Sequence, residues 1–401
     1  MLVVEEFHGT QVTKQRVEMV ERKGTGHPDQ ICDCIMDSIS VALSQAYLSE
    51  FGTILHHNID KGLLAAGRVE KRFGGGEVLE PMELTIGDRA TFTLAGKEIP
   101  VHDIAVAAAK GWIARNLRHV DPERHVSYRL KLAPGSQELT DIFARPGEVM
   151  GANDTSAAVG YYPLSPTERA VLALERELNG ERFKTLYPET GEDVKVMGLR
   201  TGDELDLTVA MPLLAERVAS ERDYFERKHA IETAMQHFLA EACRGFRRTR
   251  VHYNTLDQTG RALSGVYLSL LGTSAEDADS GQVGRGNRVN GLIPIARPIG
   301  TEAAAGKNPM SHVGKIYNVL SHRIARDICK SVDGVQGAYV MLLSRIGDPV
   351  DRPQMANAQL VMEPGRSVAE VEGEVREVMQ RQLSGITEFC NALARGVYPV
   401  C

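Results

Sequence analysis

"GTGHPDQ", residues 24–30, lies between the strand-like lead VEMVERK and a run of residues with helical periodicity. Pro28 suits the first turn of a helix, where its missing N–H costs nothing. The apolar residues after it fall on one stripe at helical spacing: Ile31, Ile35, Ile39 and Leu43. The stretch therefore predicts a glycine-rich loop that leads into a buried helix.

The glycines and polar residues of this loop favour an anion as ligand. Gly24 and Gly26 let the backbone approach a ligand closely, and a helix N-terminus offers free N–H groups to phosphate oxygens. His27 could donate to the same anion, and Asp29 could hold a Mg²⁺ that accompanies a polyphosphate. A turn with a capping acid explains the same seven residues, because short glycine motifs recur by chance. Two carboxylates follow at helical spacing and are expected on a solvated face: Asp33 and Asp37.

Length and charge limit the class of protein. A chain of 401 residues, 43% hydrophobic and 25% charged, is too long for one core, so two or three domains or subdomains are expected. The net charge of −7 argues against binding to nucleic acid or to an acidic membrane. The six cysteines show no CxxC spacing, which argues against zinc and against a disulfide framework. No signal-like N-terminus and no apolar run of about 18 residues is present, so a cytoplasmic location without a membrane span is expected.

Helical and strand-like segments are interspersed along the chain. Helical periodicity occurs at residues 30–49, 103–117, 165–178, 212–243, 311–331 and 366–396. Segments rich in β-branched and apolar residues predict strands: MELTIG (82–87), SYRLKL (127–132), DVKVMGL (193–199), ELDLTVAM (204–211), GVYLSLLG (265–272) and AYVMLLS (338–344). This mixture predicts an α+β or α/β protein. The best candidate seams are the Gly-rich polar segments 146–153 and 272–291.

Three more stretches carry charged residues that could serve a phosphate site. In GEDVKVMG, Asp193 and Lys195 are two apart in an expected strand and so project from one face, as a functional pair or as an exposed ion pair. The loop DADSGQVGRGNRVNG, residues 277–291, is either solvated or functional. In AAAGKNP, Lys307 follows a glycine as a P-loop lysine does, but the first motif glycine and the final Ser or Thr are missing.

Taken in order, these segments resemble those of a known enzyme family. They are ERKGTGHPDQICD (21–33), EFGTILHHN (50–58), FGGG (73–76), ANDTSAAVGYYPLSPTER (152–169), GEDVKVMGLR (191–200), GTSAEDADSGQVGRGNRVNGLI (272–293) and AAGKNPMSHVGKIYN (304–318). The set is similar to that of methionine adenosyltransferases of the archaeal type, also called S-adenosylmethionine synthetases. The resemblance spans nearly the whole chain.

The resemblance implies roles for individual residues. His27 would contact the phosphates of ATP, and Asp29 would bind Mg²⁺. The cations that hold the triphosphate chain would be Lys195, Arg285 and Lys307. The acids implied at the site are Glu21, Asp154 in the adenosine and methionine pocket, Asp193 as the second metal-linked acid, and Asp279 facing the methionine ammonium.

One segment departs from the family pattern. Archaeal-type relatives usually carry GxGSxD where this chain reads APGSQE, residues 133–138. Gly135 and Ser136 are kept and are assigned to the nucleotide site, whereas Pro134 removes an N–H that could have served a ligand. Nucleotide affinity and substrate choice are therefore open. The basic run RGFRRTR, residues 244–250, has no role in the family and is expected to be a solvated face.

Fold, partners and cofactors follow from the same resemblance. It implies an α+β fold of three similar subdomains, each a β-sheet with helices on one face, with the sheets packed together and at a dimer interface. The corresponding parts are residues 1–140 with GHPD, 141–270 with ANDTS and DVK, and 271–401 with GRGNR and GKN. The implied partners are ATP, L-methionine and a second copy of the chain, in a homodimer or higher oligomer with active sites between subunits. The implied cofactors are Mg²⁺ and, as an optional addition, K⁺.

The implied reaction accounts for the residue types. The thioether of methionine would attack C5′ of ATP and expel tripolyphosphate, which is then hydrolysed to phosphate and pyrophosphate. A thioether carries no proton, so no general base is needed, and positioned cations would stabilise the leaving group. Two alternatives stay open. Another sulfur nucleophile is favoured only by the APGSQE change, and a non-catalytic nucleotide or S-adenosylmethionine sensor would be expected to have lost Lys195 or Asp29.

Overall fold

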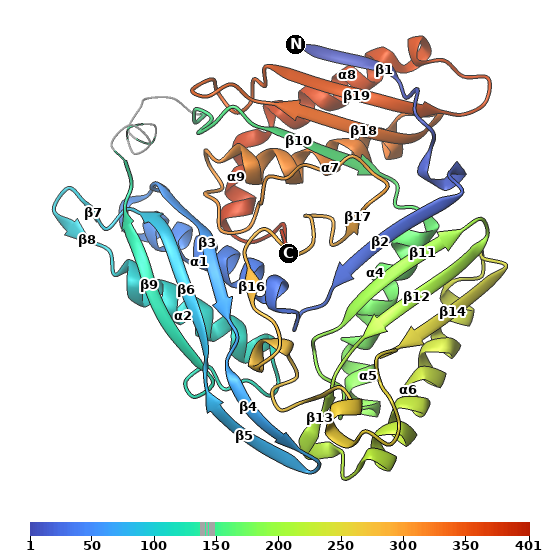
Figure 1. Ribbon diagram of the computed structural model, residues 1–401. Helices are drawn as coiled ribbons and strands as arrows, with labels where there is room; N and C mark the ends of the chain where they lie inside the picture. Colours follow the sequence, from blue (N-terminus) through green and yellow to red (C-terminus); the bar gives the residue numbers. More distant parts are fainter. Residues whose placement is uncertain (137–140, 142, 144–148) are drawn as a thin grey trace.

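The computed structural model describes residues 1–136, 141, 143 and 149–401. Three sheets of four or five strands each surround the middle of the molecule, and helices pack on them (Figure 1). The predicted α+β class is confirmed. Residue 401 lies in the middle of this view, whereas the N-terminal strand lies at its upper edge.

Each large sheet is named after one of its central strands. The β3 sheet has the order β16 (Gly281–Gln282), β3 (His57–Ala65), β6 (Met82–Ala90) and β9 (Val126–Pro134). The β11 sheet has the order β14 (Arg248–Tyr253), β12 (Glu204–Ala210), β11 (Lys195–Thr201), β2 (Val17–Lys23) and β17 (Ile293–Pro294). The β18 sheet has the order β1 (Leu2–Glu6), β19 (Met355–Met362), β18 (Val335–Leu343) and β10 (Ala157–Tyr162). Three strand pairs complete the list: β4 (Arg68–Arg72) with β5 (Gly75–Glu80), β7 (Thr93–Leu94) with β8 (Lys97–Glu98), and β13 (Leu213–Leu214) with β15 (Leu268–Ser269).

Helices pack on each sheet and enclose one apolar core with it. The β3 sheet carries α1 (Pro28–Phe51) and α2 (Val101–Asn116), and the β11 sheet carries α4 (Pro166–Leu178), α5 (Glu181–Leu186) and α6 (Glu221–Ala242). The β18 sheet carries α7 (Val313–Ser331), α8 (Val368–Ser384) and α9 (Ile386–Ala394). Among the described helices, α1 alone is long and apolar enough to cross a membrane, but 61% of that window is buried in the protein, and a core helix passes the same test.

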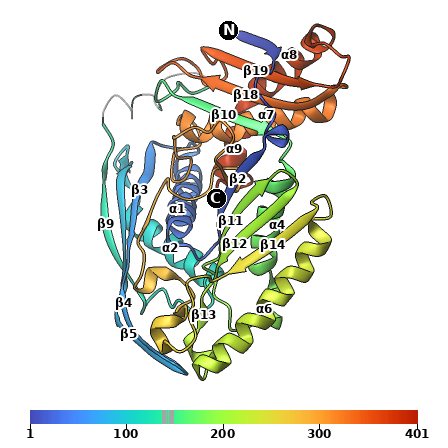
Figure 2. The ribbon, with the colours of Figure 1, turned by 45° about the vertical axis from the view of Figure 1, so that its right-hand side comes forward.

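The sheets draw on distant parts of the chain. β1 pairs in parallel with β19 at the C-terminal end. In another sheet β2 lies beside β11 (Figure 2) and pairs with it and with β17. The segment 281–294 supplies β16 to the β3 sheet and β17 to the β11 sheet. Consecutive residues therefore serve different sheets, and the boundaries 1–140, 141–270 and 271–401 stay a prediction. Part of the seam at 146–153 lies outside the described residues.

Three expected elements differ from the observed ones. The helix expected at 212–243 begins only at Glu221, after Ser220 accepts the N–H of Asp223 as its cap, and that expected at 366–396 divides at Gly385. GVYLSLLG contributes only the two-residue strand β15. The carboxylate of Glu276 accepts the N–H groups that follow this strand and so ends the ladder there, at Leu270 and Leu271.

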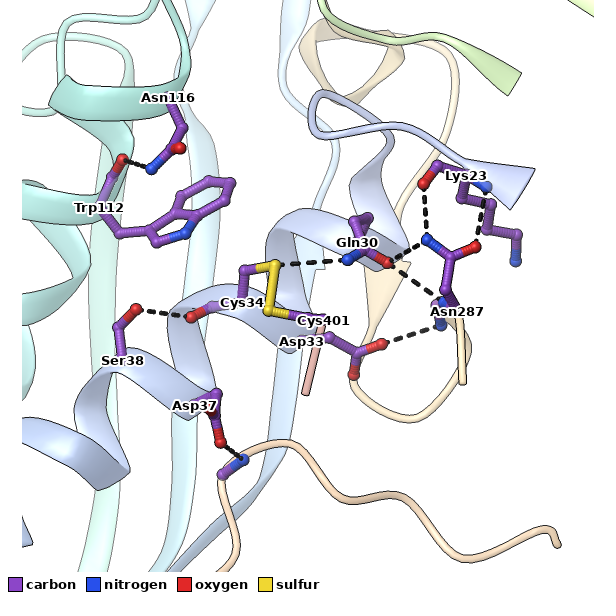
Figure 3. Close-up of a disulfide and its surroundings, with 12 residues drawn as sticks. Lys23, Gln30, Asp33, Cys34, Asp37, Ser38, Trp112, Asn116, Asn287 and Cys401 are labelled. Atoms are coloured by element: carbon purple, nitrogen blue, oxygen red, sulfur yellow. Dashed lines mark hydrogen bonds between the residues drawn. A yellow bond between two sulfur atoms is a disulfide. The ribbon is translucent and has the colours of Figure 1, made fainter. Parts of the chain in front are cut away.

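The cysteines also depart from expectation. Cys34 on α1 and Cys401 form a disulfide, with their Cα atoms 5.5 Å apart (Figure 3). The argument against a disulfide framework relied on local spacing, and this pair is separated by 367 residues. Local spacing therefore does not exclude a single long-range bond of this kind. Four cysteines are free: Cys32, Cys243, Cys329 and Cys390.

Candidate functional site

The loop of residues 24–30 leads into α1 as the sequence predicts. Pro28 is the first helical residue, and His27 is the N-cap, whose Nδ1 accepts the N–H of Asp29 at 3.2 Å. The tight backbone approach at Gly26 is to protein: a Cβ there would lie 2.4 Å from the carbonyl carbon of Glu192. The glycines therefore fix the loop against residues 192–194, rather than leaving it open to a ligand on that side.

Asp29 is surrounded by groups from two segments, the end of β2 and the segment 281–294. Its Oδ2 accepts from the ammonium of Lys23 at 2.9 Å, and its Oδ1 accepts the N–H of Gln282 at 2.9 Å. The Nε atom of Arg285 is 3.7 Å from Oδ1. The ammonium of Lys23 also donates to the carbonyl oxygen of Arg285, at 2.6 Å. Lys23, which was not predicted as a site residue, thus brings together two residues that were, Asp29 and Arg285.

His27 is uncharged at neutral pH. Burial, followed by the positive charge of Lys23, lowers the pKa of His27 to about 4. Because Nδ1 accepts a hydrogen bond from the backbone, the single ring proton of the neutral form is on Nε2. The side chain can therefore donate one hydrogen bond to an anion without carrying charge.

Polar side chains of α1 hold the glycine-rich loop 284–287. Asp33 accepts the N–H groups of Gly284 at 2.7 Å and Gly286 at 3.0 Å. Gln30 accepts from the side chain of Asn287, which also bonds the backbone of Lys23 (Figure 3). Burial raises the pKa of Asp33 to about 6. The expectation that α1 exposes a solvated acidic face here is wrong, because the carboxylate serves these backbone donors; Asp37 likewise bonds the buried ammonium of Lys315 at 2.6 Å.

Lys195 and Glu21 form an ion pair on the open face of the β11 sheet. Their charged groups are 3.3 Å apart, and the lysine side chain is 44% exposed. Lys195 is the register partner of Lys23, and Glu21 lies two residues before Lys23 on β2. The alternate residue Val20 points into the core beneath α4. One sheet face thus presents three charged side chains beside the loop of residues 24–30.

Asp193 is placed differently from the prediction. It precedes β11 instead of lying within it, and it is 4% exposed. Its Oδ2 accepts the N–H of Ser274 at 2.8 Å and the hydroxyl at 2.5 Å. Burial, and then the negative charge of the exposed Asp279, raise the pKa of Asp193 to about 6. The ion-pair partner of Lys195 is Glu21 rather than Asp193.

Lys307 is buried in a separate ion-pair cluster. Its ammonium bonds the carboxylate of Asp60 and lies 3.0 Å from Glu302. Burial would lower the pKa of Lys307, but Asp60 raises it overall. Within the described ranges, the ion pairs of Lys307 do not reach residues 21–29. The predicted triphosphate cations thus do not form one group within this chain.

The remaining predicted residues lie on loops. Asp154 is exposed before β10, and its carboxylate accepts the N–H of Thr155 at 2.7 Å. Gly135 and Ser136 follow directly after β9, and residues 137 and 138 of the APGSQE segment lie outside the described residues. The basic run of residues 244–250 forms ion pairs with acids of neighbouring segments, such as that of Arg247 with Asp203 at 3.1 Å.

A magnesium ion fits this site only together with a phosphate ligand. In the described part of the chain, no group of three or more His, Cys, Asp and Glu side chains could hold a metal alone. Mg²⁺ is commonly bound by one or two carboxylates plus substrate phosphates. Asp29, buried at the mouth of α1 with donors from two segments, offers one such carboxylate. Asp193 is engaged with Ser274 and is the weaker candidate.

Residues 1–397 match the model of a family described as S-adenosylmethionine synthetase. The chain is 46% identical over 389 residues to the S-adenosylmethionine synthase of Pyrococcus furiosus, with 96% of each chain covered. It is 44% identical to that of Aeropyrum pernix and 43% to that of Methanothermobacter thermautotrophicus, with 98% of each chain covered in both cases. In fold it is similar to an S-adenosylmethionine synthetase from Campylobacter jejuni, with a TM-score of 0.59, 14% identity and 95% and 94% of the two chains covered.

These similarities define an enzyme class, the methionine adenosyltransferases. The chain belongs to the S-adenosylmethionine synthetase family, in the branch represented by its archaeal relatives at 43–46% identity. The resemblance inferred from the ordered motifs is confirmed.

Proposed function

We propose that the protein synthesises S-adenosylmethionine from ATP and L-methionine and then hydrolyses the tripolyphosphate to phosphate and pyrophosphate. The observation that carries this proposal is the family match over residues 1–397. The sulfur of methionine would attack C5′ in line, and negative charge would grow on the departing oxygen. Positioned cations lower the free energy of such a transition state without a proton transfer.

The described residues can share this work. Lys195 and Arg285 would attract the polyphosphate to the loop of residues 24–30, and His27 would donate its Nε2 proton to a phosphate oxygen. Lys307 lies in a separate cluster of this chain, so we propose that it would reach a polyphosphate in a site shared between two subunits. Mg²⁺, held by Asp29 together with the phosphates, would neutralise charge on the leaving group. K⁺ is the second cation that we propose for the enzyme.

A product assay tests this function. Purified protein with ATP, Mg²⁺ and L-methionine should yield S-adenosylmethionine, phosphate and pyrophosphate by mass analysis. ADP or AMP as the main nucleotide product would refute the proposal. An adenosyl product formed only with a different thioether or thiol would favour transfer to another sulfur nucleophile, the alternative that the APGSQE segment raises.

We also propose a homodimer that covers the open face of the β11 sheet. Leu199 on β11 is opposite Met19 on β2, and they are 38% and 43% exposed. Ile295, whose N–H bonds the carbonyl of Met19, is 52% exposed. This apolar strip continues into the face that carries Glu21 and Lys195. A second subunit on the strip would thus also enclose the charged groups, as a shared active site requires.

Replacing Leu199 by Glu should convert the dimer to monomers and abolish synthesis, because a charge would be buried in the apolar strip. Sedimentation velocity and the product assay would measure both effects. Leu256, which is 90% exposed elsewhere, offers the matched control, and its replacement by Glu should leave the dimer intact. An active monomer, in the variant or in the unmodified protein, would contradict the proposal.

A cytoplasmic location belongs to the same proposal, since its substrates are metabolites of the cell interior. The bond between Cys34 and Cys401 is an unusual feature for a reducing compartment. Thiol labelling of protein purified from its host compartment would establish which form exists there.

A further inference from the structure

Lys23 is a buried cation to which the proposed reaction gives no role. It ends β2 and is 9% exposed. Its ammonium bridges the carboxylate of Asp29, at 2.9 Å, and the backbone carbonyl of Arg285, at 2.6 Å. It thereby joins the loop of residues 24–30 to the loop of residues 284–287, which α1 holds from the other side (Figure 3).

Two other cations and one acid lie near the ammonium of Lys23. Lys195 is its register partner on β11, and both lysines, with Arg285, act on His27 to lower its pKa after burial has done so. Asp29 is the acid that Lys23 contacts directly, and the other oxygen of that carboxylate accepts the N–H of Gln282. A divalent cation that approaches Asp29 must therefore meet the ammonium of Lys23, because both compete for the same carboxylate.

We propose that Lys23 is a positioning residue and an exchangeable counter-ion of Asp29, which a divalent cation replaces when a polyphosphate binds. In the free protein the ammonium neutralises Asp29. With Mg²⁺ and the polyphosphate bound, Asp29 would hold the metal, and the ammonium of Lys23 would turn to a phosphate oxygen. A lysine suits this exchange, since its ammonium is a point charge on a flexible stem and not a rigid fork.

This inference rests on the proposed function, because it assumes that the polyphosphate of ATP binds at this loop. It goes beyond that function in a measurable way. Without the ammonium, Asp29 would repel a polyphosphate unless a divalent cation lay between them. The requirement for the metal in binding should therefore depend on residue 23.

The test measures the Kd of tripolyphosphate by calorimetry, once in EDTA and once in Mg²⁺. The unmodified protein should bind it in both buffers. The Lys23→Met variant should bind it roughly tenfold to a hundredfold more weakly in EDTA, because the carboxylate of Asp29 then lacks its charge-assisted partner and repels the polyphosphate. Mg²⁺ should restore most of this loss, because the metal then supplies the missing positive charge beside Asp29.

A matched control lies elsewhere in the chain. Lys228 bridges the carboxylate of Asp257 and the carbonyl of Asn254, both at 2.8 Å, with similar burial. Its replacement by Met should leave both Kd values unchanged. In the Lys23→Met, Asp29→Asn double variant, the loss in EDTA should be smaller than in the single variant, since the repelling charge is gone.

The outcomes separate the inference from the function. Equal weakening of Lys23→Met in both buffers, or no weakening in either, would overturn the exchange. If Lys23→Met does not fold, Lys23→Arg decides: it should bind in EDTA and gain less from Mg²⁺ than the unmodified protein, and an equal gain would overturn the exchange. Metal rescue in a protein that makes no S-adenosylmethionine would refute the proposed function alone. Absence of tripolyphosphate binding to the unmodified protein would refute both.

Discussion

Replacing Lys195 by Met should lower the rate of S-adenosylmethionine synthesis by a factor on the order of 10²–10³, the cost of removing one donor to a developing negative charge. The methionine keeps most of the packing of the lysine stem and removes its charge. The ammonium is half-exposed beside Glu21, on the face that carries Lys23, and can therefore reach a ligand. KM for ATP should change less, because Arg285 and the metal would still hold the phosphates. Steady-state kinetics measure both quantities.

Hydrolysis of added tripolyphosphate distinguishes the role of Lys195 further. A lysine directed at the oxygen that leaves C5′ should affect synthesis more than hydrolysis. The matched control is Arg129, which forms a half-exposed ion pair with Glu83 at 2.9 Å on the β3 sheet. Exposed pairs of this kind contribute at most about 1 kcal/mol, so Arg129→Met should keep its turnover. Wild-type synthesis rates in Lys195→Met would remove Lys195 from the site and weaken the other assignments.

The start of α1 shows what local sequence can determine. Proline at the first turn, a capping side chain and an apolar stripe are all short-range features, and the structure has the helix begin at Pro28 with His27 as its cap. The strand expected for VEMVERK is observed as β2, with Val20 inward and Glu21 on the open face. Its apolar pattern does not give the two faces, however, because Glu18 is buried and Met19 is exposed. The two-residue period of a strand could have identified Lys23, which lies on the face of Glu21 two residues later.

The rest depends on segments that are distant in sequence. Asp33 is polar and at helical spacing, so a solvated position was the simplest expectation; its backbone partners, the glycines of the loop 284–287, are about 250 positions away. Asp60, one of the two acids beside Lys307, comes from β3, which the sequence did not single out as part of a charged motif. The ordered motifs supplied the site residues as a prediction. Only tertiary structure could show that Asp29 already has a cation and that Lys307 already has acids.

Replacing Arg200 by Met should lower the free energy of unfolding by about 3–5 kcal/mol, the cost of leaving one member of a buried ion pair alone. Arg200 lies on the core side of β11, and its Nε is 3.1 Å from the carboxylate of Glu18 on β2, with side-chain exposures of 8% and 1%. The guanidinium also donates to three backbone carbonyls, those of Val12, Gln15 and Gly202. Its removal leaves Glu18 with the hydroxyl of Ser165 as its remaining described donor. Urea unfolding followed by circular dichroism, at fixed protein concentration, measures the change.

Two further variants test whether the loss of stability comes from the uncompensated buried carboxylate of Glu18. Arg247 pairs with Asp203 on the surface, with both side chains more than 60% exposed, so Arg247→Met should cost less than about 1 kcal/mol. Replacing Arg200 by Met and Glu18 by Leu together should recover a large part of the stability, because the uncompensated carboxylate is removed as well. A loss below about 1 kcal/mol in Arg200→Met would contradict the argument. Glu18 lies on the strand that carries Glu21 and Lys23. Arg200→Met should therefore also weaken tripolyphosphate binding, because the charged face depends on the stability of the core below it.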